Sequence, residues 1–241
     1  PLPVINLDEI THRLSLPGTE ERAAGMKAYL KSDLDFFGVS VPEVRAAIKR
    51  AYRENRDLGR EDLLRVSLEC FDSSYFEMQL FGVLLLERYS PLLEPEDLRH
   101  IERLVRRCET WALVDPLSKP GASLVDRDMA GLGTILDRWS VDENFWLRRM
   151  SLLVLMPGLI RDDEYWDRFT GYADSMIGEK EFFVRKAIGW VLREVSKVRP
   201  GPVAEYTQRH VPVISGVTFR EAVKYLPEPT RTELREAYKK R

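Results

Sequence analysis

Hydrophobic residues recur every three or four positions along most of this chain, which is the period of a helix with one buried face. Ser40 and Glu43 stand at capping-box spacing, with Pro42 in the first turn, and predict a helix from Ser40 to about Asn55. Strand patterns, with alternating polar and apolar residues, are nearly absent. We therefore expect an all-α protein.

Further helices are predicted from the same period. Ser74 and Glu77 repeat the capping-box spacing and open a helix over 75–88, which Ser90 and Pro91 close. The remaining helical patterns cover roughly 19–33, 60–71, 95–107, 128–139, 142–156, 162–177, 180–197, 202–209, 217–225 and 229–239. Turns are expected at Pro17-Gly18, Pro157-Gly158, Pro200-Gly201-Pro202 and Pro227-Glu228-Pro229. No long Gly/Ser linker divides the chain, which favours a single domain over residues 1–241.

A short motif, Arg-x-Ala-Ile/Val, recurs at a nearly constant interval. It begins at Arg45, Arg185 and Arg220, so the first two copies are four steps of 35 residues apart and the third is one step further. The intermediate steps fall near Met78, Leu113 and Arg148, where apolar helices also begin. The signatures of tetratricopeptide and ankyrin repeats are absent. The interval predicts an α-solenoid of about six HEAT-like helix pairs, a curved superhelix with equivalent positions on one concave face.

This register places an unusual set of side chains opposite the core stripe. At about 100° per residue, two Trp residues, an acid and several cations fall in or beside one sector of about 100°. The members are Trp111, Asp115, Arg149, Lys186, Trp190, Arg193 and Lys197. Each has a structural alternative: the indoles can pack between repeats, Asp115 can cap a turn before Pro116, and the cations can form surface ion pairs. Only their common register favours a binding surface.

The motif arginines themselves fall outside that sector. Arg45, Arg185 and Arg220 are expected to form salt bridges between repeats rather than to bind a ligand.

Charge is unevenly distributed along the chain. The net charge is −2, but residues 181–241 hold 13 Lys and Arg against 7 Asp and Glu, whereas residues 1–180 hold 24 against 32. A basic zone on an acidic body suits a protein that grips a polyanion with one face. A solvated C-terminal surface explains the asymmetry equally well.

Other features exclude several classes of protein. The longest apolar runs, such as Leu80–Leu86, are far shorter than the ~20 residues of a membrane span. The N-terminal residues do not have the pattern of a signal peptide. Cys70 and Cys108 lack partners at metal-ligand spacing, and the three histidines are isolated. We expect a reduced, cytoplasmic protein with structural thiols and with no bound metal, no cofactor and no membrane contact.

Several blocks resemble the bacterial DNA alkylation repair glycosylases of the AlkD type, which are built from HEAT-like repeats. The resemblance covers roughly residues 26–226. Its strongest blocks are FFVRKAIGWVLRE at 182–194, Tyr206 and REAVKYL at 220–226; weaker ones are Tyr29-Leu30-Lys31 with Phe37-Gly38-Val39 and Pro42-Glu43, Trp111-x-x-Val114-Asp115, and Asn144-x-Trp146-Leu147-x-Arg149. The resemblance implies a monofunctional glycosylase that excises cationic N3- and N7-alkylated purines from double-stranded DNA.

The resemblance also implies roles for individual residues. Trp111 and Trp190 would be aromatic walls and Asp115 the catalytic carboxylate. Tyr29 would lie beside the lesion. The cations expected to bind the DNA backbone are Arg148, Arg149, Lys186, Arg193 and Lys197.

The sequence departs from the family pattern near the expected carboxylate. Thr110 stands where the family type has a second Trp, and Pro116 follows Asp115 directly. Lys119-Pro120-Gly121 indicates a different local loop. These differences concern the shape of the site rather than the presence of its main residues.

Departure of a cationic base leaves positive charge on the deoxyribose, as in glycoside hydrolysis. Asp115 would stabilise that oxocarbenium-like sugar, and the family route would need no flipping of the base into a pocket. Two alternatives stay open: a non-catalytic protein that binds branched or distorted DNA, and a protein-binding scaffold. We expect a monomer that needs no obligate protein partner.

Overall fold

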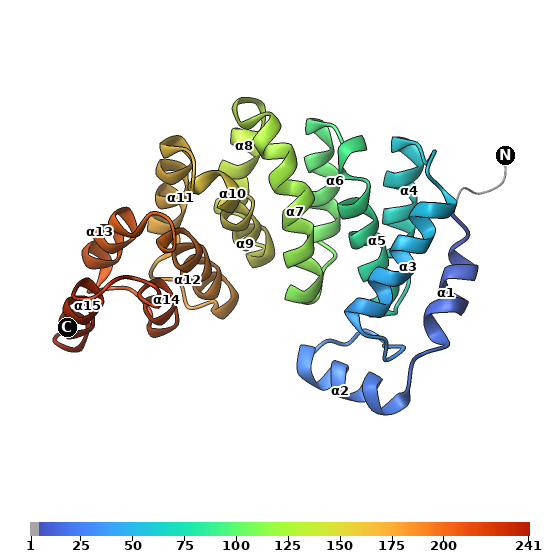
Figure 1. Ribbon diagram of the computed structural model, residues 1–241, viewed down its shortest axis with the longest axis horizontal. Coiled ribbons are helices and arrows are strands. Elements are labelled where there is room, and N and C mark those ends of the chain that lie inside the picture. Colours follow the sequence, from blue (N-terminus) through green and yellow to red (C-terminus); the bar gives the residue numbers. More distant parts are fainter. Residues whose placement is uncertain (1–4) are drawn as a thin grey trace. The chain divides into compact units, whose positions relative to one another are not determined.

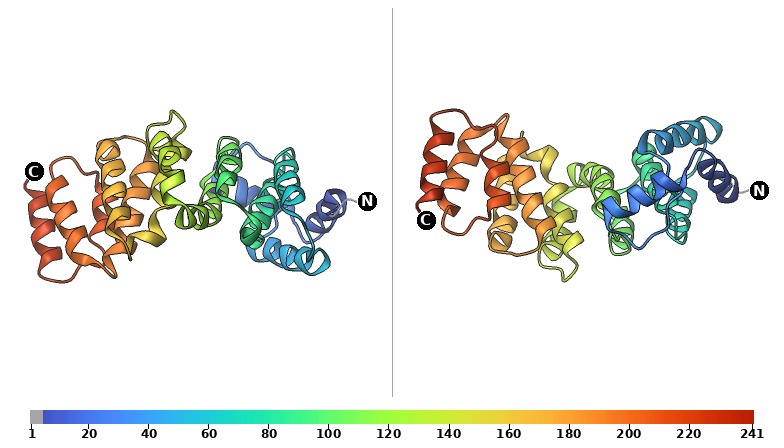
Figure 2. Two further views of the ribbon diagram at one scale, coloured as in Figure 1. Left: turned by 90° about the horizontal axis from the view of Figure 1, so that it is seen from above. Right: turned by 90° about the horizontal axis from the view of Figure 1, so that it is seen from below.

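The computed structural model describes residues 5–241, which form helices joined by short loops (Figures 1 and 2). The chain divides into two compact units, Pro1–Arg127 and Asp128–Arg241. Unit 1 contains α1 (Leu7–Ser15), α2 (Glu20–Leu30), α3 (Val41–Glu54), α4 (Arg60–Cys70), α5 (Phe76–Arg88), α6 (Leu98–Val105) and α7 (Trp111–Arg127). Unit 2 contains α8 (Met129–Ser140), α9 (Phe145–Leu153), α10 (Met156–Leu159), α11 (Asp163–Met176), α12 (Phe182–Ser196), α13 (Pro200–His210), α14 (Gly216–Ala222) and α15 (Thr230–Lys239). Two 3₁₀ turns, Ser90–Leu92 and Pro95–Asp97, precede α6.

The predicted 35-residue interval corresponds to alternate helices of the fold. Its six phase positions, 45, 78, 113, 148, 185 and 220, fall in α3, α5, α7, α9, α12 and α14 respectively. In unit 1, α3 packs on α5 and α5 on α7, while α4 and α6 cover them as partners. In unit 2, α9 packs on α12 and α12 on α14. The all-α solenoid architecture is therefore confirmed, whereas the single-domain organisation stays a prediction.

Burial follows this stacking. Every residue of α5 from Phe76 to Leu86 is buried, because the helix is covered on all sides by its neighbours. By contrast, α2 has no buried residue and contributes nothing to the core of unit 1. The free cysteines, Cys70 and Cys108, are both buried, as their predicted structural role requires.

A buried acid holds the loop between α2 and α3. Glu77 is fully buried, and its carboxylate accepts hydrogen bonds from the backbone N–H groups of Phe37 (3.0 Å), Gly38 (2.9 Å) and Val39 (3.0 Å). Gly38 has a φ of +83°, in the region that favours glycine, and this lets three successive N–H groups converge on one acceptor. The prediction of a capping box at Ser74 and Glu77 is wrong, because the Glu77 carboxylate accepts hydrogen bonds from this loop instead of from the backbone of Ser74.

The cap predicted for α3 is confirmed. Ser40 and Glu43 form both bonds of a capping box. Hydrogen bonds from the Ser40 side chain and backbone, then from Arg22, lower the pKa of Glu43 to about 2.

Three local expectations differ from the structure, and one helix was not predicted. The loop expected at Lys119-Pro120-Gly121 is absent, because α7 continues through both Pro116 and Pro120 to Arg127. The turn expected at Pro200 is instead the start of α13, since proline is tolerated in a first helical turn. Pro157-Gly158 lies in the short helix α10, and α1 was not predicted.

One of the three expected inter-repeat salt bridges is present. Arg45 of α3 pairs with Glu87 of α5 at 3.3 Å. Arg185 instead donates to the carbonyl of Glu179, just before its own helix. Arg220 has no ion pair among residues 5–241. These two predictions are wrong.

Candidate functional site

The N-terminus of α7 carries two of the predicted site residues. Thr110 caps it: its hydroxyl accepts a hydrogen bond from the N–H of Ala112 at 3.3 Å, and its carbonyl accepts from the next two N–H groups. Trp111 and Asp115 follow at a spacing of four residues, so their side chains lie on one face, one turn apart. Both side chains are half-exposed. The polar cap at Thr110 thus fixes the first turn from which both project.

Two prolines change the backbone beside Asp115. Pro116 and Pro120 have no N–H, so the carbonyls of Ala112 and Pro116 lose their usual helical donors. The carbonyl of Asp115 accepts a further bond from the Ser118 hydroxyl at 2.6 Å. Asp115 is also engaged in an interaction with a neighbouring group. The acid is therefore held in a helix, not turned into a loop.

Tyr29 lies against the indole of Trp111. The two ring centroids are 6.1 Å apart in an edge-to-face arrangement, and Tyr29 remains 73% exposed. Because Tyr29 is exposed and α2 has no buried residue, this side chain does not contribute to a hydrophobic core. Unit 1 therefore places Tyr29 against Trp111, with Asp115 one turn further along α7.

In unit 2, α12 presents Trp190 where α14 approaches closely. A Cβ on Gly189 would lie 2.8 Å from the Glu221 Cβ and 3.1 Å from Thr218, so only glycine fits. Thr218 also donates to the carbonyl of Arg185 at 3.0 Å. These contacts fix the turn of α12 that carries the half-exposed indole.

Arg149 is placed differently from its prediction. Only 3% of the residue is exposed, and its guanidinium donates to the carbonyl of Phe183 at 2.6 Å. The guanidinium carbon lies 5.8 Å from the centroid of the Trp190 ring. Arg149 therefore joins α9 to the start of α12 and supports the indole, and in this conformation it does not present its charge to solvent.

Two predicted cations of α12 share one acid. Lys186 and Arg193 both pair with Glu221 of α14. Burial raises the pKa of Glu221, but the bonds and charges of Lys186 and Arg193 outweigh it and hold that pKa below its ordinary value. Glu221 therefore stays ionised and partly neutralises both cations in the free protein.

The last two predicted cations differ in accessibility. Arg148 bonds Glu179 and the carbonyls of Asp142 and Glu143, which makes it a structural residue of the α8–α9 connection. Lys197 is exposed, pairs with Glu194 at 2.6 Å and lies 4.9 Å from the ring centroid of Tyr225. Of these two cations, Lys197 is the one that can move towards a ligand.

Sequence reasoning missed Glu221, although the repeat interval points to it. Glu221 follows Lys186 by 35 residues, so it occupies the equivalent position in the next repeat. Equivalent positions of adjacent repeats lie side by side in a solenoid, and an acid there is the natural partner of a cation. Reading the charges in register would have identified this pair.

Metal clusters and membrane spans would indicate other classes of function. Among residues 5–241, no group of three or more His, Cys, Asp or Glu side chains is arranged to hold a metal ion. Within the same range, every helix is too short or too polar to span a lipid bilayer.

Comparison with known proteins shows the family to which the chain belongs. The family model for DNA alkylation repair enzymes matches residues 10–226. A solved structure described as a predicted DNA alkylation repair enzyme from Enterococcus faecalis is similar, with 28% identity and a TM-score of 0.79, over 88% of this chain and 97% of that one. No curated protein matches the chain. The chain belongs to the family of DNA alkylation repair enzymes.

Proposed function

We propose that this DNA repair protein is an alkylpurine DNA glycosylase that excises cationic N3- and N7-alkylated purines. The observation that carries the proposal is the pair on α7: a half-exposed carboxylate, Asp115, one helical turn from a half-exposed indole, Trp111. Neither side chain belongs to the core of unit 1. A negative group beside an electron-rich ring face is suited to stabilising a cation.

The reaction supplies such a cation. When a positively charged purine leaves, its glycosidic electrons depart with it and positive charge develops on the sugar C1′. Asp115 would stabilise that charge and position the water that attacks it. An anionic group aimed at charge that grows during the reaction lowers the barrier, because it binds the transition state more tightly than the ground state.

The aromatic residues would add to the same stabilisation. Trp111 and Trp190 would each contribute about 0.5–2 kcal/mol through their ring faces, depending on how far water is excluded. Tyr29 would extend the aromatic surface at Trp111, which it touches. Arg149 would act as a positioning residue for Trp190, because it is buried and bonded to the start of α12.

Lys186, Arg193 and Lys197 are the proposed contacts to DNA phosphates. Each cation pairs with a glutamate in the free protein, so a DNA phosphate would displace that glutamate or bind the cation beside it. Such contacts provide salt-dependent affinity without reading sequence. Arg148 is left out of this set, since its guanidinium is committed to Glu179 and two carbonyls.

The proposal favours lesions whose base is already cationic. A site that acts on the sugar needs no contact with the base, so the base need not be flipped into a pocket, and bulky adducts can be accommodated. A neutral base such as uracil leaves poorly without general-acid help and should be a poor substrate. This pattern of substrates separates the proposed route from that of base-flipping glycosylases.

A base-release assay tests the proposal against its alternatives. Duplex DNA with a single N7-methylguanine is incubated with the protein, and the free base is measured by chromatography. Released base supports the glycosylase. Binding that weakens steeply with salt but releases no base indicates a non-catalytic DNA-binding member, and absence of DNA affinity indicates a protein-binding scaffold. The monomeric state and the cytoplasmic location stay predictions.

A further inference from the structure

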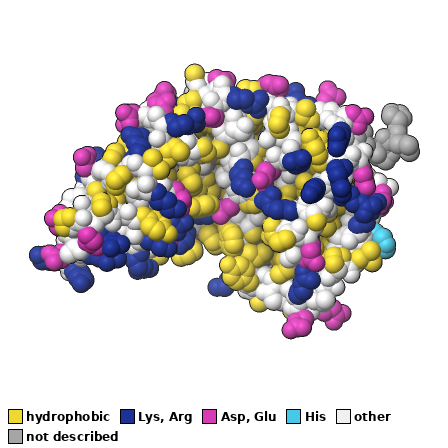
Figure 3. Space-filling view, viewed as in Figure 1, with side chains coloured by type: hydrophobic (Ala, Val, Ile, Leu, Met, Phe, Trp, Pro, Cys, Tyr) yellow, Lys and Arg dark blue, Asp and Glu magenta, His cyan; other side chains and the backbone are white. Residues whose placement is uncertain are grey.

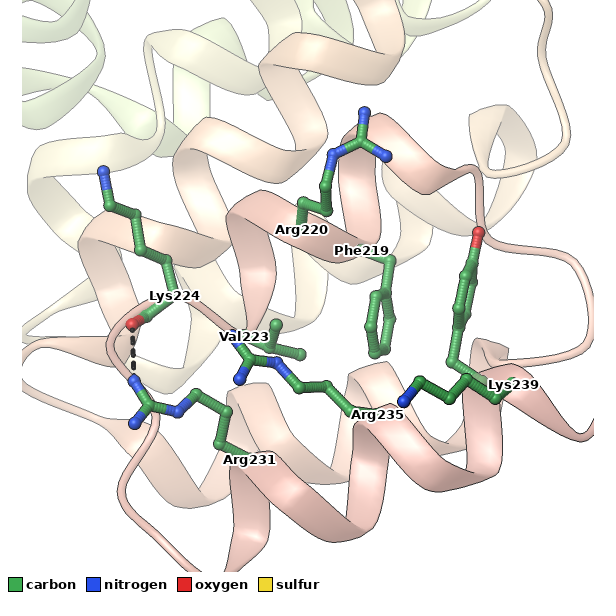
Figure 4. Close-up of a pocket in the computed structure, with 8 residues that line it drawn as sticks. Phe219, Arg220, Val223, Lys224, Arg231, Arg235 and Lys239 are labelled. Atoms are coloured by element: carbon green, nitrogen blue, oxygen red, sulfur yellow. Dashed lines mark hydrogen bonds between the residues drawn. The ribbon is translucent and has the colours of Figure 1, made fainter.

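A basic groove lies between α14 and α15, at the C-terminal end of unit 2 (Figure 4). It encloses about 640 Å³, within the range of ligand sites. Five cations line it, with no acidic residue among its lining: Arg220, Lys224, Arg231, Arg235 and Lys239. The family match ends at residue 226, so α15 (Thr230–Lys239) and its three cations lie beyond the matched segment. In Figure 3, Lys and Arg side chains gather over this end of the unit, at the lower left.

The cations form two rows. Arg231, Arg235 and Lys239 follow one another at intervals of four residues, which places them on one face of α15. Arg220 and Lys224, also four residues apart, line the groove from the α14 segment. Figure 4 shows Arg231 and Arg235 projecting from α15 towards α14. Two rows of cations thus border one groove.

Most of this charge is not neutralised within the protein. Arg231 pairs with Glu228 at 2.6 Å and donates to the carbonyl of Lys224 at 3.4 Å. For the other four cations of the groove, residues 5–241 provide no ion-pair partner. Like charges four residues apart on one face of a helix repel each other and destabilise it. The arrangement opposes folding slightly and is suited to a ligand with several negative charges.

The floor of the groove is apolar and rigid. The rings of Phe219 and Tyr238 stack with centroids 4.1 Å apart and planes at 12°, and Phe219 and Val223 are buried. Arg241 stacks on Tyr238 at 3.9 Å and donates to its hydroxyl at 2.7 Å. Because Arg241 also bonds the carbonyls of Val211 and Ile214, the ring is fixed from both sides. A closed floor leaves the cations as the recognising groups.

The groove continues the cationic surface of α12. The ring of Tyr225 is approached by the Lys224 ammonium at 5.4 Å and by the Lys197 ammonium of α12 at 4.9 Å. Arg220 of the groove is followed directly by Glu221, the acid that pairs with Lys186 and Arg193. The ligand of the groove is therefore expected to be the ligand of α12 as well.

We propose that the α14–α15 groove binds the phosphodiester backbone of duplex DNA, as a second anchor beside the contacts of α12. DNA is the partner that the family implies, and it carries the regularly spaced phosphates that two rows of cations would engage. The inference requires DNA binding but not excision chemistry. Its failure is therefore distinguishable from failure of the glycosylase proposal.

The test compares two double variants with the same change of charge. Arg235→Gln/Lys239→Gln removes two exposed cations of the groove, whereas the control Lys180→Gln/Arg209→Gln removes two cations elsewhere in unit 2. Affinity for an undamaged duplex is measured by fluorescence anisotropy at several salt concentrations. The melting temperature of each variant establishes that it is folded.

The groove variant should bind several-fold more weakly, and its slope of log K against log salt should be shallower by about 1.8, which is about 0.9 for each phosphate that the protein no longer neutralises. The control should change the slope by much less. Equal slopes in the two variants would overturn the inference. The inference would also be overturned if the DNA slopes were equal and tripolyphosphate raised the melting temperature of the wild type but not of the groove variant. That result would show that the groove binds small anions instead of DNA.

Discussion

Glu77 provides a stringent test of how the structure supports the candidate site. Its buried carboxylate holds the α2–α3 loop, which leads from the helix that carries Tyr29. We consider Glu77→Gln, which keeps the shape of the side chain and removes the charge. The variant asks whether a charged acceptor is required at this position.

The expected loss follows from the atoms involved. Gly38 and Val39 both donate to Oε1 (2.9 and 3.0 Å), and the amide oxygen of Gln can replace it. Phe37 donates to Oε2 (3.0 Å), where Gln places an NH₂ that cannot accept. The charge-assisted bond from Phe37 is lost, which costs about 1.5–3 kcal/mol. The bonds from Gly38 and Val39 become neutral hydrogen bonds, and each is weakened by about 1 kcal/mol. Relief from burying a charge offsets part of this sum, which leaves a loss of about 2–3 kcal/mol.

Urea unfolding at pH 7 measures the loss, and amide hydrogen exchange locates it. The amides of Phe37, Gly38 and Val39 should lose protection in the variant. The matched control is Glu87→Gln on the same helix, which removes surface pairs with Arg45 and Lys119 and should cost less than about 1 kcal/mol. A Glu77→Gln protein within about 0.5 kcal/mol of the wild type, with those amides still protected, would show that no charged acceptor is required at this position.

Three further variants probe the cap of α7, a half-buried histidine and the α12–α14 contact. Thr110→Ala should lower the free energy of unfolding by about 1 kcal/mol, because a cap is lost, whereas Thr110→Ser should be close to the wild type; a loss shared by both would contradict the capping role. Burial, then the charge of Arg103, lowers the pKa of His100 to about 4, so the unfolded chain binds the extra proton between pH 6.5 and 4 and stability falls as the pH drops through that window. From pH 7 to 4.5 this contributes about 2 kcal/mol, which His100→Gln should lack; urea unfolding curves of equal pH dependence would disprove it. Glu221→Gln should tighten DNA binding several-fold at low salt, because two cations lose their acid, and unchanged or weaker binding by anisotropy would show that the acid orients rather than neutralises them.

The repeat architecture could be predicted because it depends on a local and repeated pattern. A helix pair of fixed length recurs with its apolar face in register, so the positions of Arg45, Arg185 and Arg220 were sufficient to identify alternate helices. The face shared by Trp111 and Asp115 followed from the same helical geometry. Local rules failed where a side chain bonds a group that is distant in sequence. Glu77, for example, accepts hydrogen bonds from the α2–α3 loop instead of capping its own helix.

The remaining differences have similar causes. Pro120-Gly121 reads as a loop in isolation, yet α7 continues through it, packed on α5 and α6. The burial of Arg149 depends on a hydrogen bond to a carbonyl 34 residues away, and the helical period of the sequence does not predict such a contact. Partners of charged side chains are set by the adjacent repeat. They could be predicted only by comparing positions one interval apart, as Lys186 and Glu221 show.

Whether Asp115 stabilises the sugar cation is tested most directly by the single-turnover rate of base release from duplex DNA containing N7-methylguanine, for the wild type and for Asp115→Asn. Loss of one group aimed at the developing charge should slow release by about 10²-fold or more, with DNA affinity retained. Asp126→Asn, on the exposed part of the same helix, should react as the wild type does. An Asp115→Asn protein that releases the base within about threefold of the wild-type rate would contradict the account, because a carboxylate that stabilises the sugar cation cannot be neutralised without a large loss of rate.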